Sequence, residues 1–316
     1  MSISSTVQKT APKEQLVAHV FRGIVAMVLG VFFFTIQDLI IKMISGGYPV
    51  HEIVFVRSFA AILIIGVIAR FDQGFAGLKT SRLGLHIARS IVMFGAYTLY
   101  YLGLASLSLA DTTVISYAAP FFIATLALVF LGERVSTAQW GAIAVGFLGV
   151  LIVMRPGSGL FNAAALLPLA AAMLYAVAQM LARYIGRTDT GSSLAFYLTI
   201  AFVVLSGLCG IVFQLLPLPV LGNPSFDFLV RPWAWPTNYD LALMLICGLV
   251  ASLGIYCLSQ AYRLAPAALV SSFEYSSIPW VILWGVLFFG QWPTLATIGG
   301  VILVVSSGLF MLWKAD

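Results

Sequence analysis

The chain has 316 residues, of which 61% are hydrophobic and only 9% are charged, and its formal net charge is +5 at pH 7. A soluble protein of this length could not bury so much apolar surface, so the composition indicates a multi-pass helical membrane protein without an independent soluble domain. The excess of Lys and Arg predicts contact with the lipid bilayer and its headgroups, and not with nucleic acid.

Ten apolar stretches follow one another along the chain, and each is close to the roughly 20 residues that a helix needs to cross a bilayer. Residues 1–19 are polar and have no signal-peptide pattern, which predicts a cytosolic tail before the first span. In chain order the expected spans are Val20–Ser45, Val50–Arg70, Leu83–Leu107, Asp111–Leu131, Ala138–Met154, Ala163–Tyr184, Ser192–Leu216, Asp240–Arg263, Pro266–Phe289 and Pro293–Trp313.

Two stretches of the chain are similar to each other, Ser108–Gly157 and Ala265–Lys314. Each contains an apolar helix with an internal proline, a turn with Gly followed by Glu or Gln, and a second apolar helix. Five expected spans fall in each half, and because five is odd the second copy enters the bilayer upside down. The predicted fold class is an all-α integral membrane protein with ten transmembrane helices in two inverted five-helix repeats, residues 20–157 and 158–316. Such repeats are typical of secondary transporters with a substrate site at the repeat interface.

The Lys and Arg residues divide unequally between the two ends of the expected spans. With the N-terminus inside, eleven lie toward the inner side and four toward the outer side, and Arg89 falls within the membrane. The positive-inside rule therefore predicts that both termini are cytoplasmic. This orientation places the turn Gly132-Glu133-Arg134 inside and the corresponding turn Gly290-Gln291 outside. We expect the membrane to be a bacterial inner (plasma) membrane.

The stretch LADTTVISYAAPFF at the start of Leu109–Gly157, and FEYSSIPW at the start of Phe273–Gly308, resemble the EamA-type members of the drug/metabolite transporter superfamily. The sequence QDLIIK at Gln37–Lys42 resembles the subgroup that contains S-adenosylmethionine uptake carriers and related metabolite carriers. The resemblance implies ten helices in two inverted repeats, alternating access, and a central cavity lined by the first, third, fourth, sixth, eighth and ninth helices. The chain departs from the family at Gln291, where many members have Glu, so no salt bridge is expected at that turn.

Charged side chains within the spans are candidates for coupling or gating, because burying one in hydrocarbon costs about 2.5–3.5 kcal/mol on insertion scales. Asp38 and Lys42 are four residues apart on one helix face and are expected to pair, with Arg57 completing the cluster. Arg89 and Glu274 lie about two turns from the inner ends of the third and ninth spans, where a salt bridge between them would close the inner mouth. The alternatives are permanent structural pairs and, for Glu274, binding of a substrate ammonium group or a coupling proton.

Polar and aromatic side chains recur every three or four residues on four of the spans, so each span presents a polar stripe. A single stripe is explained by hydrogen bonds between helices, but four stripes predict a shared water-filled cavity, because such faces cannot contact acyl chains. Walls of this composition suit a zwitterionic or cationic organic metabolite held by stacking and cation–π contact. The candidate substrate-binding residues are Tyr97, Tyr101 (or Tyr100), Tyr175, Gln179, Tyr256, Gln260, Ser271, Glu274 and Tyr275.

Two prolines lie near the middle of expected spans, Pro120 in the fourth and Pro279 in the ninth. Each removes backbone hydrogen bonds, so each is a candidate hinge or a static kink. The fifth and tenth spans have almost no polar groups, and Ala142 and Gly146 form a small-residue contact face. These two helices are expected to pack or to dimerise, which leaves monomer and homodimer both open.

Several chemical motifs are absent from the sequence. It contains no phosphate-binding loop with GK[ST], no HExxH and no CxxC, so ATP hydrolysis, a metal site and a cofactor are not expected. The leading hypothesis is a secondary active transporter, not an enzyme, of an amino acid or related zwitterionic or cationic compound, driven by protons or by exchange. The alternatives are an uptake carrier for a nucleoside metabolite like S-adenosylmethionine and an integral-membrane enzyme acting on lipid precursors.

Overall fold

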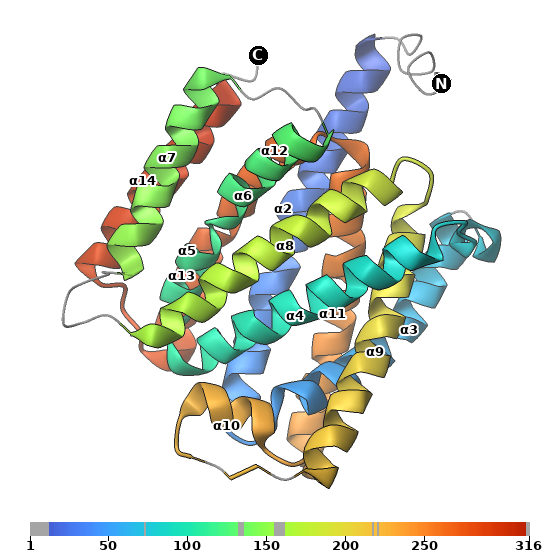
Figure 1. Ribbon diagram of the computed structural model, residues 1–316, viewed down its shortest axis with the longest axis vertical. Helices are drawn as coiled ribbons and strands as arrows, with labels where there is room; N and C mark the ends of the chain where they lie inside the picture. Colours follow the sequence, from blue (N-terminus) through green and yellow to red (C-terminus); the bar gives the residue numbers. More distant parts are fainter. Residues whose placement is uncertain are drawn as a thin grey trace.

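The computed structural model describes residues 13–72, 74–131, 136–154, 162–216, 218–219 and 221–313, and every element in this part of the chain is helical. Eight helices there are long and apolar enough to cross a membrane, and two further apolar helices, Trp140–Met154 and Leu295–Ser307, are shorter. The chain is therefore a multi-pass integral membrane protein of the all-α class (Figure 1). Of the predicted features, residues 1–12 of the tail and the turn Gly132-Glu133-Arg134 lie outside the described residues.

The helices begin and end close to the predicted boundaries, although α2 starts at Lys13 and so includes the last part of the predicted tail. The elements are α2 (Lys13–Ile44), α3 (Val50–Asp72), η1 (Phe75–Leu78), α4 (Leu83–Ser106), α5 (Leu109–Ser116), α6 (Ala119–Leu126), η2 (Ala127–Leu131), α7 (Thr137–Met154), η3 (Ala163–Ala165), α8 (Leu166–Ile185), α9 (Gly191–Leu215), α10 (Pro224–Val230), α11 (Asn238–Leu264), α12 (Ala267–Ser271), η4 (Ser272–Ser277), α13 (Ile278–Phe289) and α14 (Leu295–Trp313).

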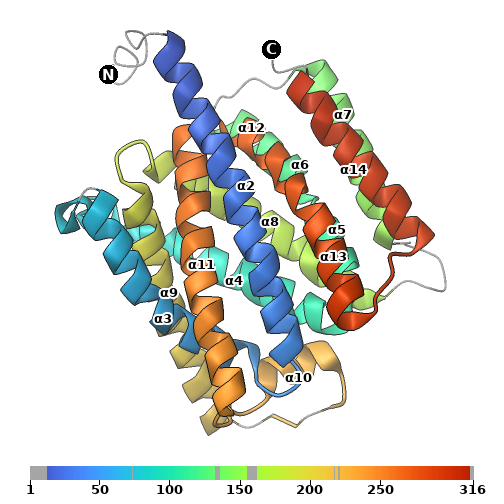
Figure 2. The ribbon, with the colours of Figure 1, turned by 180° about the vertical axis from the view of Figure 1, so that it is seen from behind.

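Helices from the first half of the chain pack against helices from the second half. α4 lies along α8, α3 along α9 and α7 along α14, and α2 lies along α11 on the face seen in Figure 2. α2 begins and α14 ends at one end of the molecule, which we call the terminal end, and α10 lies at the opposite end, the α10 end (Figure 1). The core between these pairs is formed by side chains from both halves.

Two of the spans are broken near their centres, as the two prolines predict. α5 ends at Ser116 and α6 begins at Ala119, with Pro120 in its first turn. The ninth span passes from α12 through the 3-10 segment η4 into α13, with Pro279 in the first turn of α13. The hydroxyls of Tyr117 and Ser277 hydrogen-bond to each other between the two breaks. The breaks therefore lie side by side inside the bundle, and the hinge role of the two prolines remains a prediction.

The pair α7 and α14 packs through glycine. A Cβ added to Gly300 would lie 2.5 Å from Val153 Cγ2 and 2.7 Å from the carbonyl oxygen of Gly149, whereas one added to Gly299 would meet nothing within 4 Å. Gly300→Ala is expected to lower stability by about 1–3 kcal/mol, because the backbone of α7 must move. Gly299→Ala is expected to preserve or raise it, by up to about 1 kcal/mol, because Ala favours the helix. Thermal unfolding of the purified pair in detergent measures the difference, and equal losses would contradict the close packing.

The connection between α9 and α11 is fixed to the α10 end of the bundle. The Trp233 indole nitrogen donates to His51 Nδ1 at 2.5 Å, and its ring lies against Gly210, where a Cβ would come within 2.6 Å. The Ala234 backbone N–H donates to Glu52 Oε2 at 3.1 Å. Trp235, two residues beyond Trp233, is 99% exposed. The segment therefore combines an aromatic side chain anchored by these contacts, Trp233, which is 38% exposed, with the surface aromatic Trp235, and this suits a position at the membrane interface.

A hydrogen-bonded pair ties α4 to the connection between α8 and α9. His86 Nε2 and Asp189 Oδ2 are 2.9 Å apart, and Thr188 Oγ1 donates to Asp189 Oδ1 at 2.8 Å. Burial raises the pKa of Asp189, but hydrogen bonds from His86, Thr80 and Thr188 outweigh burial and hold the pKa below its usual range. The folded state therefore prefers the ionised carboxylate.

Asp189→Asn is expected to lower stability by about 1.5–3 kcal/mol, the usual contribution of hydrogen bonds to a charged group. Because the folded pKa lies below the unfolded value of about 3.9, the contribution is complete above that value and disappears as pH falls through the folded pKa. Thermal unfolding should show a constant gap between the two proteins from about pH 5 to pH 8 that closes near pH 3. Asp72→Asn, at a carboxylate that accepts from one side chain, Ser192, among the described residues, should produce a smaller gap.

Candidate functional site

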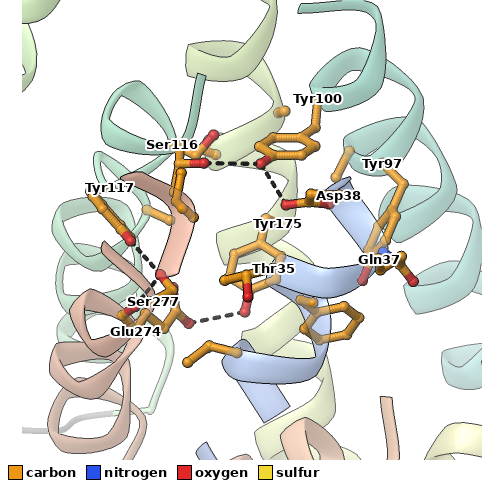
Figure 3. Close-up of a pocket in the computed structure, with 18 of the residues that line it drawn as sticks. Thr35, Gln37, Asp38, Tyr97, Tyr100, Ser116, Tyr117, Tyr175, Glu274 and Ser277 are labelled. Atoms are coloured by element: carbon orange, nitrogen blue, oxygen red, sulfur yellow. Dashed lines mark hydrogen bonds between the residues drawn. The ribbon is translucent and has the colours of Figure 1, made fainter. Parts of the chain in front are cut away.

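A cavity of about 150 Å³, counted as space open to the centres of water molecules, lies in the middle of the bundle (Figure 3). Its walls come from α2, α4, the α5–α6 break, α8 and the η4–α13 break. Among the cavity-lining residues on α4, Tyr101 lies nearest to the α10 end. At ~1.5 Å per residue, it is about 8 Å from the last residue of that helix. The cavity is thus displaced toward the α10 end. Its polar and aromatic lining consists of Phe34, Thr35, Gln37, Asp38, Tyr97, Tyr100, Tyr101, Thr113, Ser116, Tyr117, Tyr175, Glu274 and Ser277.

Asp38 lies on one wall of the cavity and is 8% exposed. The Tyr100 hydroxyl donates to Asp38 Oδ2 at 2.8 Å and lies 3.3 Å from Thr113 Oγ1 (Figure 3). α2 and α4 provide the carboxylate and the phenol, and α5 provides the threonine. The arrangement orients the carboxylate with neutral donors and leaves its charge without an ion pair among the described residues.

Glu274 lies on another wall, on η4, and is also 8% exposed. The Tyr175 hydroxyl donates to the carboxylate oxygen Oε1 at 2.9 Å (Figure 3), and the Tyr262 hydroxyl donates to the same oxygen at 2.7 Å. Ser277 Oγ donates to the Glu274 carbonyl oxygen at 2.8 Å. Since both phenols bind Oε1, the other oxygen can accept from a further donor, such as an ammonium group.

Arg57 lies behind the cavity wall. Its side chain is fully buried and its Nη1 donates to Gln37 Oε1 at 3.1 Å, while Gln37 Nε2 donates to the Tyr101 hydroxyl. The guanidinium carbon lies 5.6 Å from the ring centroid of Tyr97 and 5.7 Å from that of Phe202, which are cation–π distances. The cavity surface at Gln37 and Tyr97 is therefore backed by a positive charge.

The predicted pair of Asp38 and Lys42 is wrong. Lys42 Nζ donates to the carbonyl oxygens of Leu104 and Leu107, at 2.8 and 2.7 Å. These carbonyls end α4 and have no partner within the helix, so a nearby ammonium group satisfies them well. The lysine is thus a helix cap at the α10 end, and the predicted cluster of Asp38, Lys42 and Arg57 is not formed.

The predicted salt bridge between Arg89 and Glu274 is also wrong. Arg89 Nη1 donates to the carbonyl oxygen of Leu194 on α9 at 2.9 Å. Within the described part of the chain, the one contact at salt-bridge distance between a basic side chain and a carboxylate is that of His86 with Asp189. Arg89 therefore bonds to a neighbouring helix, and Glu274 is held by tyrosines.

Of the candidate binding residues, Tyr97, Tyr101, Tyr175 and Glu274 line the cavity and the others do not. Tyr256 and Gln260 hydrogen-bond to each other at 2.9 Å, Ser271 is fully buried, and Tyr275 packs edge-on against Tyr117 at 5.1 Å. Gln179 is buried beside the cavity. Pro120 and Pro279 begin helices beside the cavity and do not line it.

Several lining residues were not among the candidates. Thr113, Ser116, Tyr117 and Ser277 lie at the two helix breaks. The prolines beside them were the available signal, because a broken helix inside a membrane exposes backbone that needs polar neighbours. Among the described residues no group of three His, Cys, Asp or Glu side chains is placed to hold a metal ion.

Residues 21–155 match the EamA-like transporter family. The S-adenosylmethionine uptake transporter of Rickettsia conorii is 25% identical, over 88% of this chain and 88% of that protein. The riboflavin transporter of Rhizobium johnstonii is 28% identical, over 92% and 90%, and the pseudopaline exporter of Pseudomonas aeruginosa is 29% identical, over 90% and 93%. A crystal structure with 19% identity has the same fold, with a TM-score of 0.68 over 92% of this chain and 97% of that one. Through the family match over residues 21–155 and these relatives, the chain is similar over most of its length to EamA-type transporters of the drug/metabolite transporter superfamily.

Proposed function

We propose that this small-molecule transporter is a secondary active carrier for a zwitterionic or cationic organic metabolite, working by alternating access. The observation on which this depends is the central cavity with two buried carboxylates, Asp38 and Glu274, neither of which has a cationic partner among the described residues. An isolated buried carboxylate is costly. A cationic group of the substrate would offset that cost when it binds.

The packing of the helices supports an inverted repeat. If residues 158–316 repeat residues 20–157, then α3 corresponds to α9, α7 to α14, and the α5–α6 span to the α12–α13 span, and each of these pairs is in contact. Under the same correspondence α2 is equivalent to α8 and α11 to α4, so the close pair of α2 with α11 is equivalent to the close pair of α8 with α4. α7 and α14 run antiparallel, because a Cβ on Gly146 would meet Ser307 while one on Gly149 would meet Leu303. Antiparallel equivalents are expected from two halves of opposite topology.

We infer that the terminal end is cytoplasmic and that the α10 end faces the outside of a bacterial inner membrane. The excess of Lys and Arg toward the terminal end supports this orientation through the positive-inside rule. The cavity is closer to the α10 end, so in this arrangement it is closer to the outside.

The cavity walls favour a substrate that has a positive charge and a flat or sulfur-containing group. Ring centroids of Tyr97 and Tyr101 lie 5.6 Å apart, and those of Tyr100 and Tyr101 lie 5.4 Å apart, so the carboxylates stand among aromatic faces. Such faces attract cations. A compound like S-adenosylmethionine, with a sulfonium and an ammonium group, matches this chemistry better than riboflavin, which has no cationic group.

The test is counterflow in proteoliposomes against a panel of amino acids, S-adenosylmethionine and riboflavin, with and without a pH gradient. We expect exchange of a zwitterionic or cationic member, weakened by Tyr97→Ala and little changed by Tyr256→Ala, whose side chain lies away from the cavity. Movement of riboflavin alone, or equal loss with both tyrosine variants, would contradict the proposed substrate class. Chemical conversion of a lipid precursor would support the enzyme alternative.

A further inference from the structure

Beneath the cavity, toward the terminal end, four helices contribute buried polar side chains whose hydrogen-bonding atoms have no partner among the described residues. They are Arg89 Nε on α4, both amide atoms of Gln179 on α8, Ser193 Oγ on α9 and Ser259 Oγ on α11. None of the four side chains is more than 2% exposed. Buried polar atoms in folded proteins are nearly always hydrogen-bonded, so a concentration of unpaired ones needs an explanation.

The four side chains lie at a common level of the bundle. α4 and α8 are antiparallel, because a Cβ on Gly95 would lie 3.4 Å from Leu174 and one on Gly103 would lie 2.7 Å from Pro168. Continuing this alignment toward the terminal end places Arg89 beside Gln179.

The start of α9 brings the two serines to the same region. Arg89 Nη1 donates to the carbonyl oxygen of Leu194, the residue after Ser193. A Cβ on Gly191 would lie 2.6 Å from the side chain of Gln260, the residue after Ser259. The starts of α4 and α9 and the ends of α8 and α11 therefore converge on these four residues.

The cluster continues the polar faces of the cavity. Gln179 is one helical turn from Tyr175, and Ser259 is one turn from Tyr262; both tyrosines bind Glu274. Arg89 is two turns from Tyr97 on the same face of α4. A substrate released by Glu274 toward the terminal end would next meet Arg89 and Gln179, while Ser259 stands one turn from Tyr262 on its α10 side.

We propose that Arg89, Gln179, Ser193 and Ser259 form an inner binding station for a carboxylate group of the transported molecule, closed in this structure and opened when α4 and α8 separate from α9 and α11. The guanidinium, amide and hydroxyl groups are all hydrogen-bond donors, and a planar guanidinium fits a carboxylate in particular. The station rests on the proposed function and extends it, because Asp38 and Glu274 bind the cationic end of the substrate and the station binds the anionic end.

The test uses single cysteines in a protein whose Cys209, Cys247 and Cys257 are replaced by Ala. Ser193→Cys and Ser259→Cys probe the station, and neither serine hydroxyl has a hydrogen bond to lose among the residues that the structure describes. Ser206→Cys is the control, because Ser206 is equally buried on α9 but its hydroxyl donates to the Phe202 carbonyl oxygen. Inside-out and right-side-out vesicles are treated with two membrane-impermeant methanethiosulfonates, one anionic and one cationic. The labelling rate of each cysteine is divided by the rate at which the same reagent reacts with a free thiol in solution.

We expect labelling at positions 193 and 259 from the terminal end only, no labelling at 206, and a severalfold faster normalised rate for the anionic reagent. Arg89→Gln should remove that preference, whereas Arg82→Gln, at the start of the same helix, should leave it. Absence of labelling, or equal normalised rates, overturns the station. Counterflow measured on the same vesicles separates the two proposals. If labelling occurs as expected but no panel member is transported, the proposed substrate class is wrong. If a panel member is transported but the cysteines are not labelled, the proposed station is wrong.

Discussion

Glu274→Gln is expected to reduce transport of a cationic substrate by roughly 10- to 150-fold while the protein remains folded. A hydrogen bond to a charged group contributes about 1.5–3 kcal/mol, which corresponds to that range in affinity. In the native protein Tyr175 and Tyr262 donate to Glu274 Oε1. The amide oxygen of the glutamine can still accept both of these hydrogen bonds. Initial rates of counterflow per folded protein, together with the thermal transition in detergent, measure both effects.

Glu52→Gln is the matched control for Glu274→Gln. Glu52 is also a buried carboxylate, but it accepts from the Ala234 backbone at the α10 end and does not line the cavity. Transport by this variant should equal that of the native protein. Rates measured across a range of pH add a second readout, since loss of pH dependence with retained exchange would identify Glu274 as the proton-coupling group. Unchanged uptake in Glu274→Gln would exclude the glutamate as a substrate ligand.

The class of the protein and its broken spans could be predicted from sequence, because both depend on local chemistry. Hydropathy identified the membrane helices, and Pro120 and Pro279 identified the two breaks. A charged or phenolic side chain within an apolar segment must face protein or water and not lipid. This is why the sequence identifies Asp38, Tyr97 and Glu274 as candidates. The ten-helix count and the inversion of the repeats remain predictions that the packing supports.

Spacing failed where the helix geometry changed. The spacing argument treats the ninth span as one α-helix with Ser271, Glu274 and Ile278 on one face, but Ser271 ends α12 and the helix geometry changes directly after it. The central residues of the span instead form the 3-10 segment η4, in which side chains three apart share a face. Glu274 and Ser277 therefore line the cavity together.

Spacing also shows which residues share a face but not what that face meets. The stripe of Tyr256 and Gln260 on α11 does not reach the cavity. Lys42 shares a face with Asp38 but bonds to the end of α4, because the helix-terminal carbonyls are a tertiary feature that sequence separation does not encode.

Arg57→Met is expected to change stability by no more than about 1 kcal/mol and to lower transport by more than tenfold. The native guanidinium makes one hydrogen bond to Gln37 and two cation–π contacts. Each cation–π contact contributes about 0.5–2 kcal/mol. Against these stands the cost of a buried cation in hydrocarbon, about 2.5–3.5 kcal/mol on insertion scales. With the lower values of these ranges the opposing contributions nearly cancel, and methionine fills a similar volume without a charge.

Transport should nevertheless fail in Arg57→Met, because Arg57 is a positioning residue. It fixes the amide of Gln37 against the Tyr101 hydroxyl on the cavity surface, and its charge lies behind Tyr97. Arg57→Lys keeps the charge and should retain part of the activity, with a raised KM and a less affected maximal rate, since the binding wall is loosened while the transport cycle is intact. A large drop in the thermal transition of Arg57→Met with normal transport per folded molecule would instead make the arginine a purely structural link between α2, α4 and α9.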